Sequence, residues 1–412
     1  MLLRIERSPD QRAGLRRLID DFGATYFSNG LIAFIFTATG PLAIILSVGT
    51  QGGLSKAELA SWVFGVFCIN GVLSIIMSWR HKMPLGFAYT IPGTVLVGPA
   101  LQHLSFPEVI GAFYVTSLIT LAMGASGLVK RLMSSLPMPI VMGMVAGVFL
   151  RFGLDLVRSL QSDAAIAAPM IIAFIALSAS SALGKRIQPI IGALIVGVIA
   201  IAVLGRVDPS LLDGLAFAKP VVQAPAWSLA AMIELVVPLT ITVLVVQNGQ
   251  GLAVLQTAGH RAPVNSIAVM SGIGGALGAV VGAVSSCLSG PGNALLTSSG
   301  EPARQYTGAL TYGVCVILFG LLAPTFTGLM LAAPQAFIMA LAGLAMLRVL
   351  QAAFIGSFST GGFTLGALIS MLVTVADIGI FNIGAAFWGL VAGFVVSWLL
   401  ERRDFSSLAR PA

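Results

Sequence analysis

Apolar runs, separated by short stretches that contain glycine, proline or charged residues, cover almost the whole chain. Most of these runs have about 20 residues, the length that an α-helix needs to cross the hydrocarbon core of a bilayer. We divide the sequence into fourteen apolar segments: 28–48, 57–78, 86–101, 107–128, 137–157, 165–183, 188–205, 230–256, 263–282, 285–299, 305–323, 332–350, 361–376 and 380–400. The pattern predicts an all-α polytopic membrane protein.

Two of these segments, the third and the tenth, have about 15 residues and are too short for a complete helical crossing. Each contains a Pro-Gly pair, at residues 92–93 and 291–292, ahead of a short apolar run. A break at membrane depth is tolerated only where it is buried in protein or lines a cavity. We therefore expect each segment to form a short strand followed by a half-helix. Paired breaks in the two halves of a chain point to the binding site of a transporter for a small solute.

The two halves of the chain also correspond at three places in the same order. Residues 42–49 resemble 252–259, the Pro-Gly pairs come next, and Pro137, Met142, Leu150 and Arg151 recur with the same spacing as Pro334, Met339, Leu347 and Arg348. Such self-similarity indicates an internal repeat. Because each copy has an odd number of segments, the second copy enters the membrane from the opposite side. We expect a 7+7 inverted repeat, with the substrate site near the midplane between the copies.

Composition and charge agree with a chain that lies in lipid. Only 9% of the residues are charged, against about 25% in a soluble domain, and the mean hydropathy is +0.99. The net charge of +7 does not indicate nucleic-acid binding, because the basic residues are scattered between the segments. If the N-terminus is cytosolic, 17 of the 22 Lys and Arg residues fall on the cytosolic side, as the positive-inside rule requires. The exceptions are Lys56, Arg151, Arg158, Arg206 and Lys219. We therefore expect both termini in the cytosol and a retained N-terminal tail.

Three stretches of the sequence resemble one family of membrane proteins. They are the run Leu136–Gly153, the polar stretch Gln247–Gly251 and the break at Ser289–Ala294. They are similar to the benzoate membrane transport family, the BenE-type benzoate/proton symporters, and the likeness covers essentially the whole chain. The resemblance implies a protein of the bacterial cytoplasmic (inner) membrane that imports benzoate or a similar aromatic carboxylate with protons, by alternating access.

The resemblance also implies the fold of the uracil/proton symporter and the nucleobase–ascorbate transporters, in which a core domain moves against a gate domain. The implied parts are a cytosolic tail at 1–27, a core domain at 28–128 and 230–323, a gate domain at 137–205 and 332–400, and a cytosolic tail at 401–412. Relatives with this fold often dimerise through gate-domain surfaces, so the resemblance favours a homodimer.

The two breaks indicate how an anion can be held. A half-helix that begins at Gly93 or Gly292 has unpaired backbone N–H groups in its first turn, and its dipole adds about half a positive charge there. Two such ends that face each other can bind a carboxylate without a cationic side chain. No basic residue lies near either break in the sequence. We therefore predict a carboxylate ligand.

Side chains near the breaks are the candidate substrate contacts. The polar candidates lie in the middle of the first and eighth segments or just after the breaks: Thr37, Thr39, Gln247, Asn248, Thr94 and Asn293. Phe87 and Tyr89 share one face of the extended lead-in and can contact an aromatic ring. The alternatives are hydrogen bonds between helices for the polar residues and ordinary packing for the aromatic ones. Nucleobase relatives have a carboxylate where this chain has Gln247, which argues against a nucleobase.

Acidic residues inside the segments, or at the outer end of one in the case of Asp377, are candidates for proton coupling. They are Asp155, Glu234 and Asp377, and each also has a structural interpretation. Asp155 lies four residues after Arg151 and would form an ion pair with it. Glu234 suits a helix N-terminus, and Asp377 can face water. None of the histidines lies deep in a segment, so we expect loop roles for them.

Other functions are less well supported by the sequence. We keep two alternatives. The first is a uniporter or channel for small anions, and the second is a transporter of another organic anion or of a nucleobase. No cluster has metal-ligand spacing and no nucleophile has a plausible base, so we expect neither an enzyme nor a metal or cofactor. Cys68, Cys287 and Cys315 lie in apolar segments without CxxC spacing, as buried thiols do. The expected partners are an aromatic carboxylate, protons and the lipid bilayer, and no nucleic acid.

Overall fold

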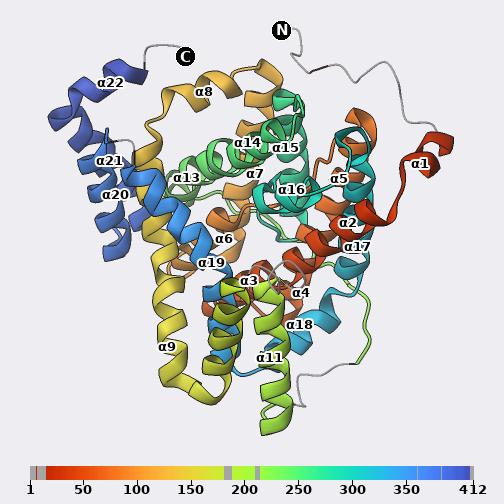
Figure 1. The fold of residues 1–412 in the computed structure, drawn as a ribbon. Helices are drawn as coiled ribbons and strands as arrows, with labels where there is room; N and C mark the ends of the chain where they lie inside the picture. The colour runs from red at the N-terminus through yellow and green to blue at the C-terminus, as the bar shows by residue number, and fades with distance from the viewer. Residues whose placement is uncertain are drawn as a thin grey trace.

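The computed structural model describes residues 6, 15–180, 188–208, 214–359, 361–381 and 383–408 of the chain. Helices make up most of this part (Figure 1). Six helical stretches in it are long and apolar enough to cross a membrane, and a bent pair of helices at 302–331 gives a seventh if it counts as one span. The prediction of a mainly helical membrane protein is confirmed.

One group of helices comes from the beginning and the third quarter of the chain. Its members include α2 (Ala24–Ala38), α3 (Gly40–Gln51), α4 (Lys56–Phe64), α5 (Asn70–His81), α7 (Phe106–Ser126), α15 (Val264–Val280) and α17 (Tyr306–Leu321). α15 packs along α7, and α17 packs along α2 and α5. At Gly30 the backbones of α2 and α17 approach so closely that a side chain there would collide with the carbonyl oxygen of Gly308. Small residues at such crossings let membrane helices pack tightly.

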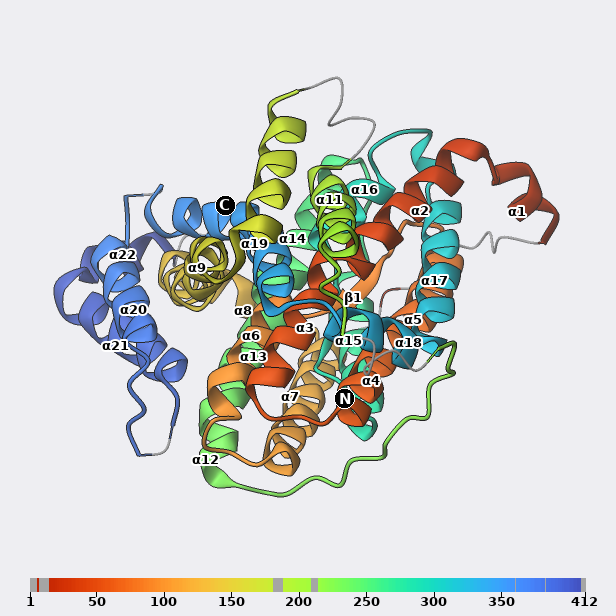
Figure 2. The same ribbon diagram turned by 90° about the horizontal axis from the view of Figure 1, so that it is seen from below.

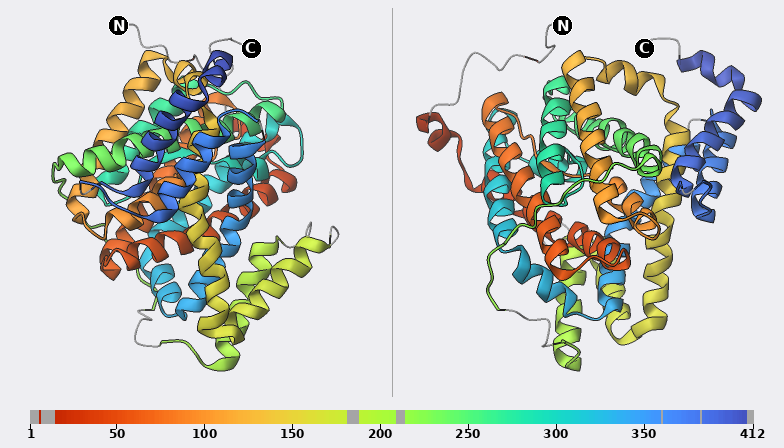
Figure 3. Two further views of the ribbon diagram at one scale, coloured as in Figure 1. Left: turned by 90° about the vertical axis from the view of Figure 1, so that its left-hand side faces the viewer. Right: turned by 180° about the vertical axis from the view of Figure 1, so that it is seen from behind.

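A second group of helices lies beside the first, and in Figure 2 its members α9, α20 and α21 are seen at the left of the molecule, as Figure 3 shows from two further sides. Its members are α9 (Met138–Ala179), α11 (Pro189–Leu204), α19 (Gln335–Phe358), α20 (Thr364–Ala376) and α21 (Ala385–Leu400). α19, α20 and α11 all pack on α9. Non-helical backbone angles at Asp163 (φ −158°, ψ 86°) divide α9 into two helices. This kink separates the two segments that the sequence predicts at 137–157 and 165–183.

Both predicted breaks are present. β1 (Phe87–Tyr89) precedes α6 (Ile91–Ala100), and β2 (Ser286–Leu288) precedes α16 (Gly290–Leu296). The two strands pair antiparallel, with Phe87 opposite Leu288 and Tyr89 opposite Ser286. Two segments about 200 residues apart in sequence therefore cross inside the protein, and each continues as a short helix.

The polar stretch around Gln247 belongs to a helix with irregular winding. This helix consists of α12 (Leu229–Ala231), the π-helical stretch η3 (Met232–Val236), α13 (Val237–Ile241), the π-helical stretch η4 (Thr242–Gln247) and α14 (Asn248–Thr257). π-helical turns are rare and often occur at functional sites, because they turn side chains away from the regular helical face. The first segment is interrupted as well, at Thr39 between α2 and α3.

Several connections were not predicted. The segment before α12 runs extended across the end of the first group, where Ala218 N–H donates to Leu321 O (2.7 Å) and Gln223 N–H donates to Val280 O (2.8 Å). α17 is followed, after a bend of 70°, by α18 (Ala323–Leu331). α1 (Leu15–Asp21), α8 (Val129–Ser135) and α22 (Arg402–Leu408) are short helices between or beyond the apolar ones. The predicted basic loop at Lys185 and Arg186 lies outside the described residues.

Glu401, at the end of α21, holds the start of α20. Its carboxylate accepts hydrogen bonds from the backbone N–H groups of Leu365 (2.8 Å) and Gly366 (3.0 Å) and from the Ser397 hydroxyl. A carboxylate at a helix N-terminus satisfies free N–H groups and interacts favourably with the dipole. Partial burial acts to raise the pKa of Glu401, but these hydrogen bonds together lower it below the ordinary value.

We expect Glu401→Gln to lower the free energy of unfolding by about 0.5–1 kcal/mol at pH 7. Because the pKa is lower in the folded state, the stabilisation is complete above the unfolded pKa of about 4.3 and is lost as the pH falls through the folded pKa. Thermal unfolding of the detergent-purified protein at pH 7 and at pH 4 measures both effects. Asp20→Asn, at an exposed acid on α1, is the control. An equal difference between Glu401→Gln and wild type at both pH values would contradict this account.

Candidate functional site

The crossing of the two strands is built so that its backbone groups have partners. Beyond the paired residues, Thr90 N–H donates to Ser285 O (3.0 Å) and Ser289 N–H donates to Gly86 O (2.9 Å). The Ser74 hydroxyl accepts from the backbone N–H of Phe87 (2.8 Å). With no water available at this depth, each unpaired backbone group would cost several kcal/mol.

Asn248 and Asn293 complete this network. The Asn293 amide accepts from Gly86 N–H (2.9 Å) and donates to Gly86 O (3.1 Å), so it pairs with the backbone of the opposite break. The Asn248 carbonyl oxygen accepts from Leu288 N–H (2.7 Å). Both side chains are at most 2% exposed. In this conformation they hold the strands together and have few bonding positions left for a ligand.

The helix tips differ from the prediction in one respect. The helices begin at Ile91 and Gly290, two residues earlier than predicted. The N–H groups of Gly93 and Gly292 are not free, because they donate to the hydroxyls of Thr90 (3.1 Å) and Ser289 (3.0 Å). These hydroxyls act as helix N-caps, and the proline at the second position of each helix has no N–H. Of the first three helical residues, only Ile91 and Gly290 keep an N–H group for a ligand.

A small cavity of about 30 Å³, which we call the central cavity, lies beside the two tips. Its lining comes from both breaks, from the first and eighth segments, and from α9 and α19: Phe36, Thr37, Pro41, Ala88, Tyr89, Ile91, Pro92, Met142, Val145, Phe149, Val246, Gln247, Gln250, Ser289, Pro291 and Val349. None of these residues is charged. Apolar walls with a few uncharged polar groups are typical of sites for small organic ligands.

Three predicted residues, Thr37, Tyr89 and Gln247, line this cavity. The side chain of Gln247 has no hydrogen-bond partner within the described part of the chain and is 7% exposed. The Tyr89 hydroxyl is buried and also lacks a partner among these residues. A buried polar group without a partner is unfavourable unless a ligand or water satisfies it. Gln247 and Tyr89 are therefore the predicted residues best placed to bind a ligand.

The other predicted residues lie around the cavity. Phe87 is fully buried, and Thr39 donates to Phe36 O (3.0 Å) at the interruption of the first segment. The Thr94 hydroxyl donates to Thr90 O (2.9 Å) within the first turn of α6. None of these three residues lines the central cavity. Their contacts in the described residues support the local backbone.

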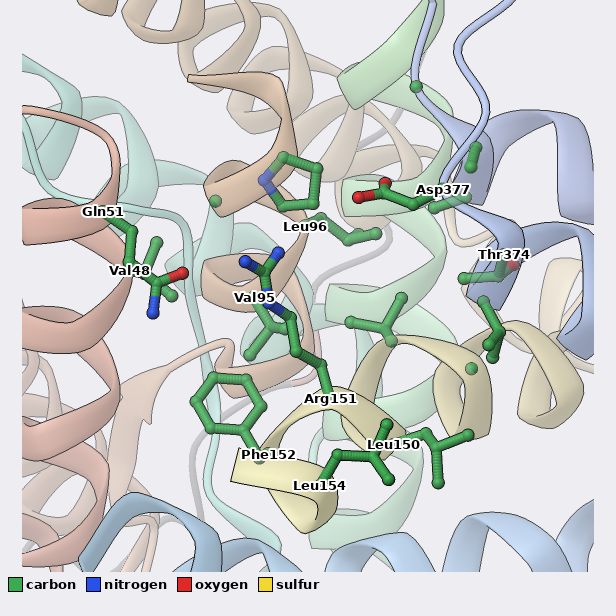
Figure 4. Close-up of a pocket in the computed structure, with 18 of the residues that line it drawn as sticks. Val48, Gln51, Val95, Leu96, Leu150, Arg151, Phe152, Leu154, Thr374 and Asp377 are labelled. Atoms are coloured by element: carbon green, nitrogen blue, oxygen red, sulfur yellow. The ribbon is translucent and has the colours of Figure 1, made fainter. Parts of the chain in front are cut away.

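A larger cavity of about 360 Å³, which we call the vestibule, opens between the two groups of helices (Figure 4). One wall comes from α3, α6 and η3, and the other comes from α9, α20 and α21. All three acids proposed for proton coupling line it: Asp155, Glu234 and Asp377. The sequence places these acids in different segments, and the fold brings them to one cavity.

The surroundings of the three acids differ. Asp155 forms an ion pair with Arg158 (3.1 Å), so the prediction that it pairs with Arg151 is wrong. Arg151 lies four residues before Asp155 and Arg158 lies three residues after it. Both arginines are therefore about one helical turn from Asp155 and can compete for its carboxylate. Glu234 is 4% exposed, and its carboxylate lies 2.9 Å from a ring nitrogen of His103. Asp377 follows the last turn of α20 in a left-handed conformation (φ 51°).

Two functional candidates were not identified from the sequence. Gln250 lines the central cavity and, like Gln247, has no hydrogen-bond partner among the described residues. The spacing of three residues between them, which places two side chains on one helical face, was the available signal. His103 contacts Glu234 from a loop 131 residues away. No local pattern in the sequence could have revealed that contact.

Two broken segments cross in an apolar helical protein beside a small cavity without charged lining residues, which is the arrangement of a membrane transport protein. The comparison with protein families is more specific. The chain belongs to the BenE family, described as benzoate membrane transport protein, whose model matches residues 20–399.

Two curated proteins are similar to this chain over nearly their whole length. The inner membrane protein YdcO of Escherichia coli (strain K12) is 28% identical over 384 residues, which cover 91% of this chain and 96% of that protein. The benzoate membrane transport protein of Acinetobacter baylyi (strain ATCC 33305 / BD413 / ADP1) is 25% identical over 397 residues, 94% of this chain and 98% of that protein.

Solved structures of anion transporters share the fold. The transmembrane domain of the cyanobacterial bicarbonate transporter BicA has a TM-score of 0.57 at 15% identity and covers 90% of this chain and 98% of that one. The murine anion transporter Slc26a9, solved in the inward-facing state, has a TM-score of 0.65 at 13% identity and covers 97% of this chain and 74% of that one. At such low identity the similarity concerns the fold alone.

The geometry predicts opposite roles for two neighbouring residues. We expect Asn248→Leu to lower the free energy of unfolding by about 1–3 kcal/mol, because it leaves the buried N–H of Leu288 without its acceptor. Gln247→Leu removes no hydrogen bond within the described residues, so we expect a change below about 1 kcal/mol. Unfolding of the two purified variants in detergent, compared with wild type, measures the difference. Equal losses of stability would contradict the assignment.

Proposed function

We propose that this protein is a secondary active transporter that imports benzoate or a similar aromatic carboxylate, together with protons, across the bacterial cytoplasmic membrane. The central cavity carries this proposal. It combines unpaired neutral hydrogen-bond donors with apolar and aromatic walls and has no charged side chain in its lining. The family membership and the fold shared with anion transporters support it.

The chemistry of the cavity suits a monocarboxylate. The amides of Gln247 and Gln250 and the N–H group of Ile91 can donate hydrogen bonds to carboxylate oxygens. The dipole of α6 adds positive potential at the same place, and low dielectric surroundings strengthen these interactions. Phe36 and Phe149 offer apolar surface for the ring. A nucleobase would need acceptors for its own N–H groups, and the lining has no carboxylate to provide them.

We assign the chain fourteen membrane segments in a 7+7 inverted repeat, with both termini in the cytosol. In this assignment 28–128 and 230–323 form a core domain, and 137–205 and 332–400 form a gate domain. The packing of the helices into two groups supports this division. The vestibule separates them and lies at the end of α20 opposite the Glu401 cap, so by this topology it faces the outside. The protein is then outward-facing here, and movement of the core domain against the gate domain would open the central cavity to the cytosol.

Glu234 is the best-placed carrier for the coupled proton. It is 4% exposed and is the only buried carboxylate in the described membrane part, and a ring nitrogen of His103 lies within hydrogen-bond distance of it. Asp377, Asp155, Arg158 and Arg151 share the vestibule with it. Gly384, which precedes α21 of the gate domain, packs so closely on the Glu234 carboxylate that a side chain there would collide with it. The charge of Glu234 therefore acts at a contact between core and gate.

In proteoliposomes, we expect saturable uptake of benzoate that an inward proton gradient stimulates. Gln247→Leu should lower kcat/KM roughly 10- to 100-fold, because a hydrogen bond to a charged group contributes about 1.5–3 kcal/mol. Gln256→Leu, an exposed site on the same helix, is the matched control and should leave uptake unchanged. Flux that never saturates, or stronger competition by uracil or sulfate than by unlabelled benzoate, would contradict the proposal.

For the proton, we expect Glu234→Gln to abolish the stimulation of uptake by an imposed proton gradient while equilibrium binding of benzoate persists. Asp155→Asn should keep the stimulation, because Asp155 is already held by Arg158. Uptake is measured with and without a protonophore, and binding is measured in detergent. Stimulation that survives in Glu234→Gln would exclude Glu234 as the carrier.

A further inference from the structure

The vestibule contains a cation that the proposed mechanism has not used. Arg151 lies on α9 and lines the vestibule, and Figure 4 shows its guanidinium projecting into the space between Gln51 and Asp377. The nearby carboxylate of Asp155 pairs with Arg158 instead. Within the described part of the chain, Arg151 has neither an ion-pair nor a hydrogen-bond partner. An arginine inside a membrane segment normally has one, or marks the path of a ligand.

The apolar walls next to Arg151 suit the ring of an aromatic acid. Val95 and Leu96 of α6 and Val148 and Phe152 of α9 line the same cavity. A volume of about 360 Å³ lies within the range of small-molecule binding sites, about 300–1,000 Å³. The planar guanidinium matches a carboxylate, with which it forms two parallel hydrogen bonds. A monocarboxylate with a ring therefore has a partner for each of its ends.

The vestibule also lies on the route to the central cavity. α9 lines the central cavity with Val145 and Phe149 and the vestibule with Val148 and Phe152, so successive residues of one helix lead from one cavity to the other. The central cavity of about 30 Å³ has room for only about two water molecules. In this conformation an incoming aromatic acid can therefore enter the vestibule before it can enter the central cavity.

The remaining charges of the vestibule orient such a ligand. Asp155 and Arg158 neutralise each other, and Glu234 lies beside His103. Asp377 lines the cavity across from Arg151 (Figure 4). Repulsion by Asp377 and attraction by Arg151 both direct a carboxylate toward α9.

We propose that Arg151 and the apolar walls of the vestibule form an outer binding site, which captures the aromatic carboxylate before it reaches the central cavity. This inference rests on the proposed function, because it takes the same substrate class. The site is distinct from the central one in its chemistry. It uses a charged guanidinium, whereas the central cavity uses neutral donors.

The first test uses the wild-type protein. 2,3-Butanedione modifies accessible arginine side chains, and peptide mass spectrometry reads each position. Benzoate should slow the modification of Arg151 at least fivefold, whereas benzamide, which has the same ring but no charge, should not. Arg348 occupies the corresponding place in the second copy and is exposed on α19, so it is the internal control. Equal rates at Arg151 with and without benzoate would overturn the outer site.

The second test measures uptake by variants. Arg151→Gln should raise the KM for benzoate about tenfold and leave kcat within twofold, Arg151→Lys should recover part of the loss, and Arg348→Gln should behave as wild type. If wild type transports benzoate and Arg151→Gln has an unchanged KM, the outer site is wrong and the proposed function stands. If wild type neither binds nor transports benzoate, the proposed function itself fails. Should Arg151→Gln not fold, the protection experiment on wild type decides.

Discussion

Every backbone N–H and C=O group of a chain in lipid needs a partner inside the protein, because no water is available to replace it. Most of this chain meets that requirement with helices, but the two Pro-Gly breaks do not. Their strands satisfy each other through antiparallel pairing, and Asn248, Asn293 and Ser74 take the remaining groups. The backbone groups of the crossing are therefore satisfied by partners from both halves of the chain.

The same constraint explains the character of the central cavity. Helices that begin in the middle of the protein direct their N-terminal ends, and hence positive potential, into its interior. Thr90 and Ser289 use part of that capacity as caps. Few free N–H donors therefore remain at the helix tips, and the side chains of Gln247 and Gln250 lie beside them in the lining of the central cavity. In our proposal an anion is held there by oriented neutral groups, while the charged residues stay in the vestibule, at the contact between the two groups of helices.

The sequence predicted the helical membrane fold and the two breaks, because long apolar runs and a Pro-Gly pair have strong local consequences. It did not predict where the tips begin, since this depends on the backbone conformation of Thr90 and Ser289. It also could not show that η4 is π-helical, or that Asn293 pairs with Gly86 in the other half of the chain. Tertiary packing also determines that His103 contacts Glu234. In the same way, it determines that Asp155 pairs with Arg158 and not with Arg151.

The most direct test of the central claim is an experimental structure of the protein with bound benzoate. The account predicts density for benzoate between the two breaks, with its carboxylate within hydrogen-bond distance of Gln247, Gln250 or the first N–H group of α6 and with its ring against Phe36 and Phe149. Benzoate bound only through arginine side chains, with nothing between the breaks at saturating concentration, would contradict it.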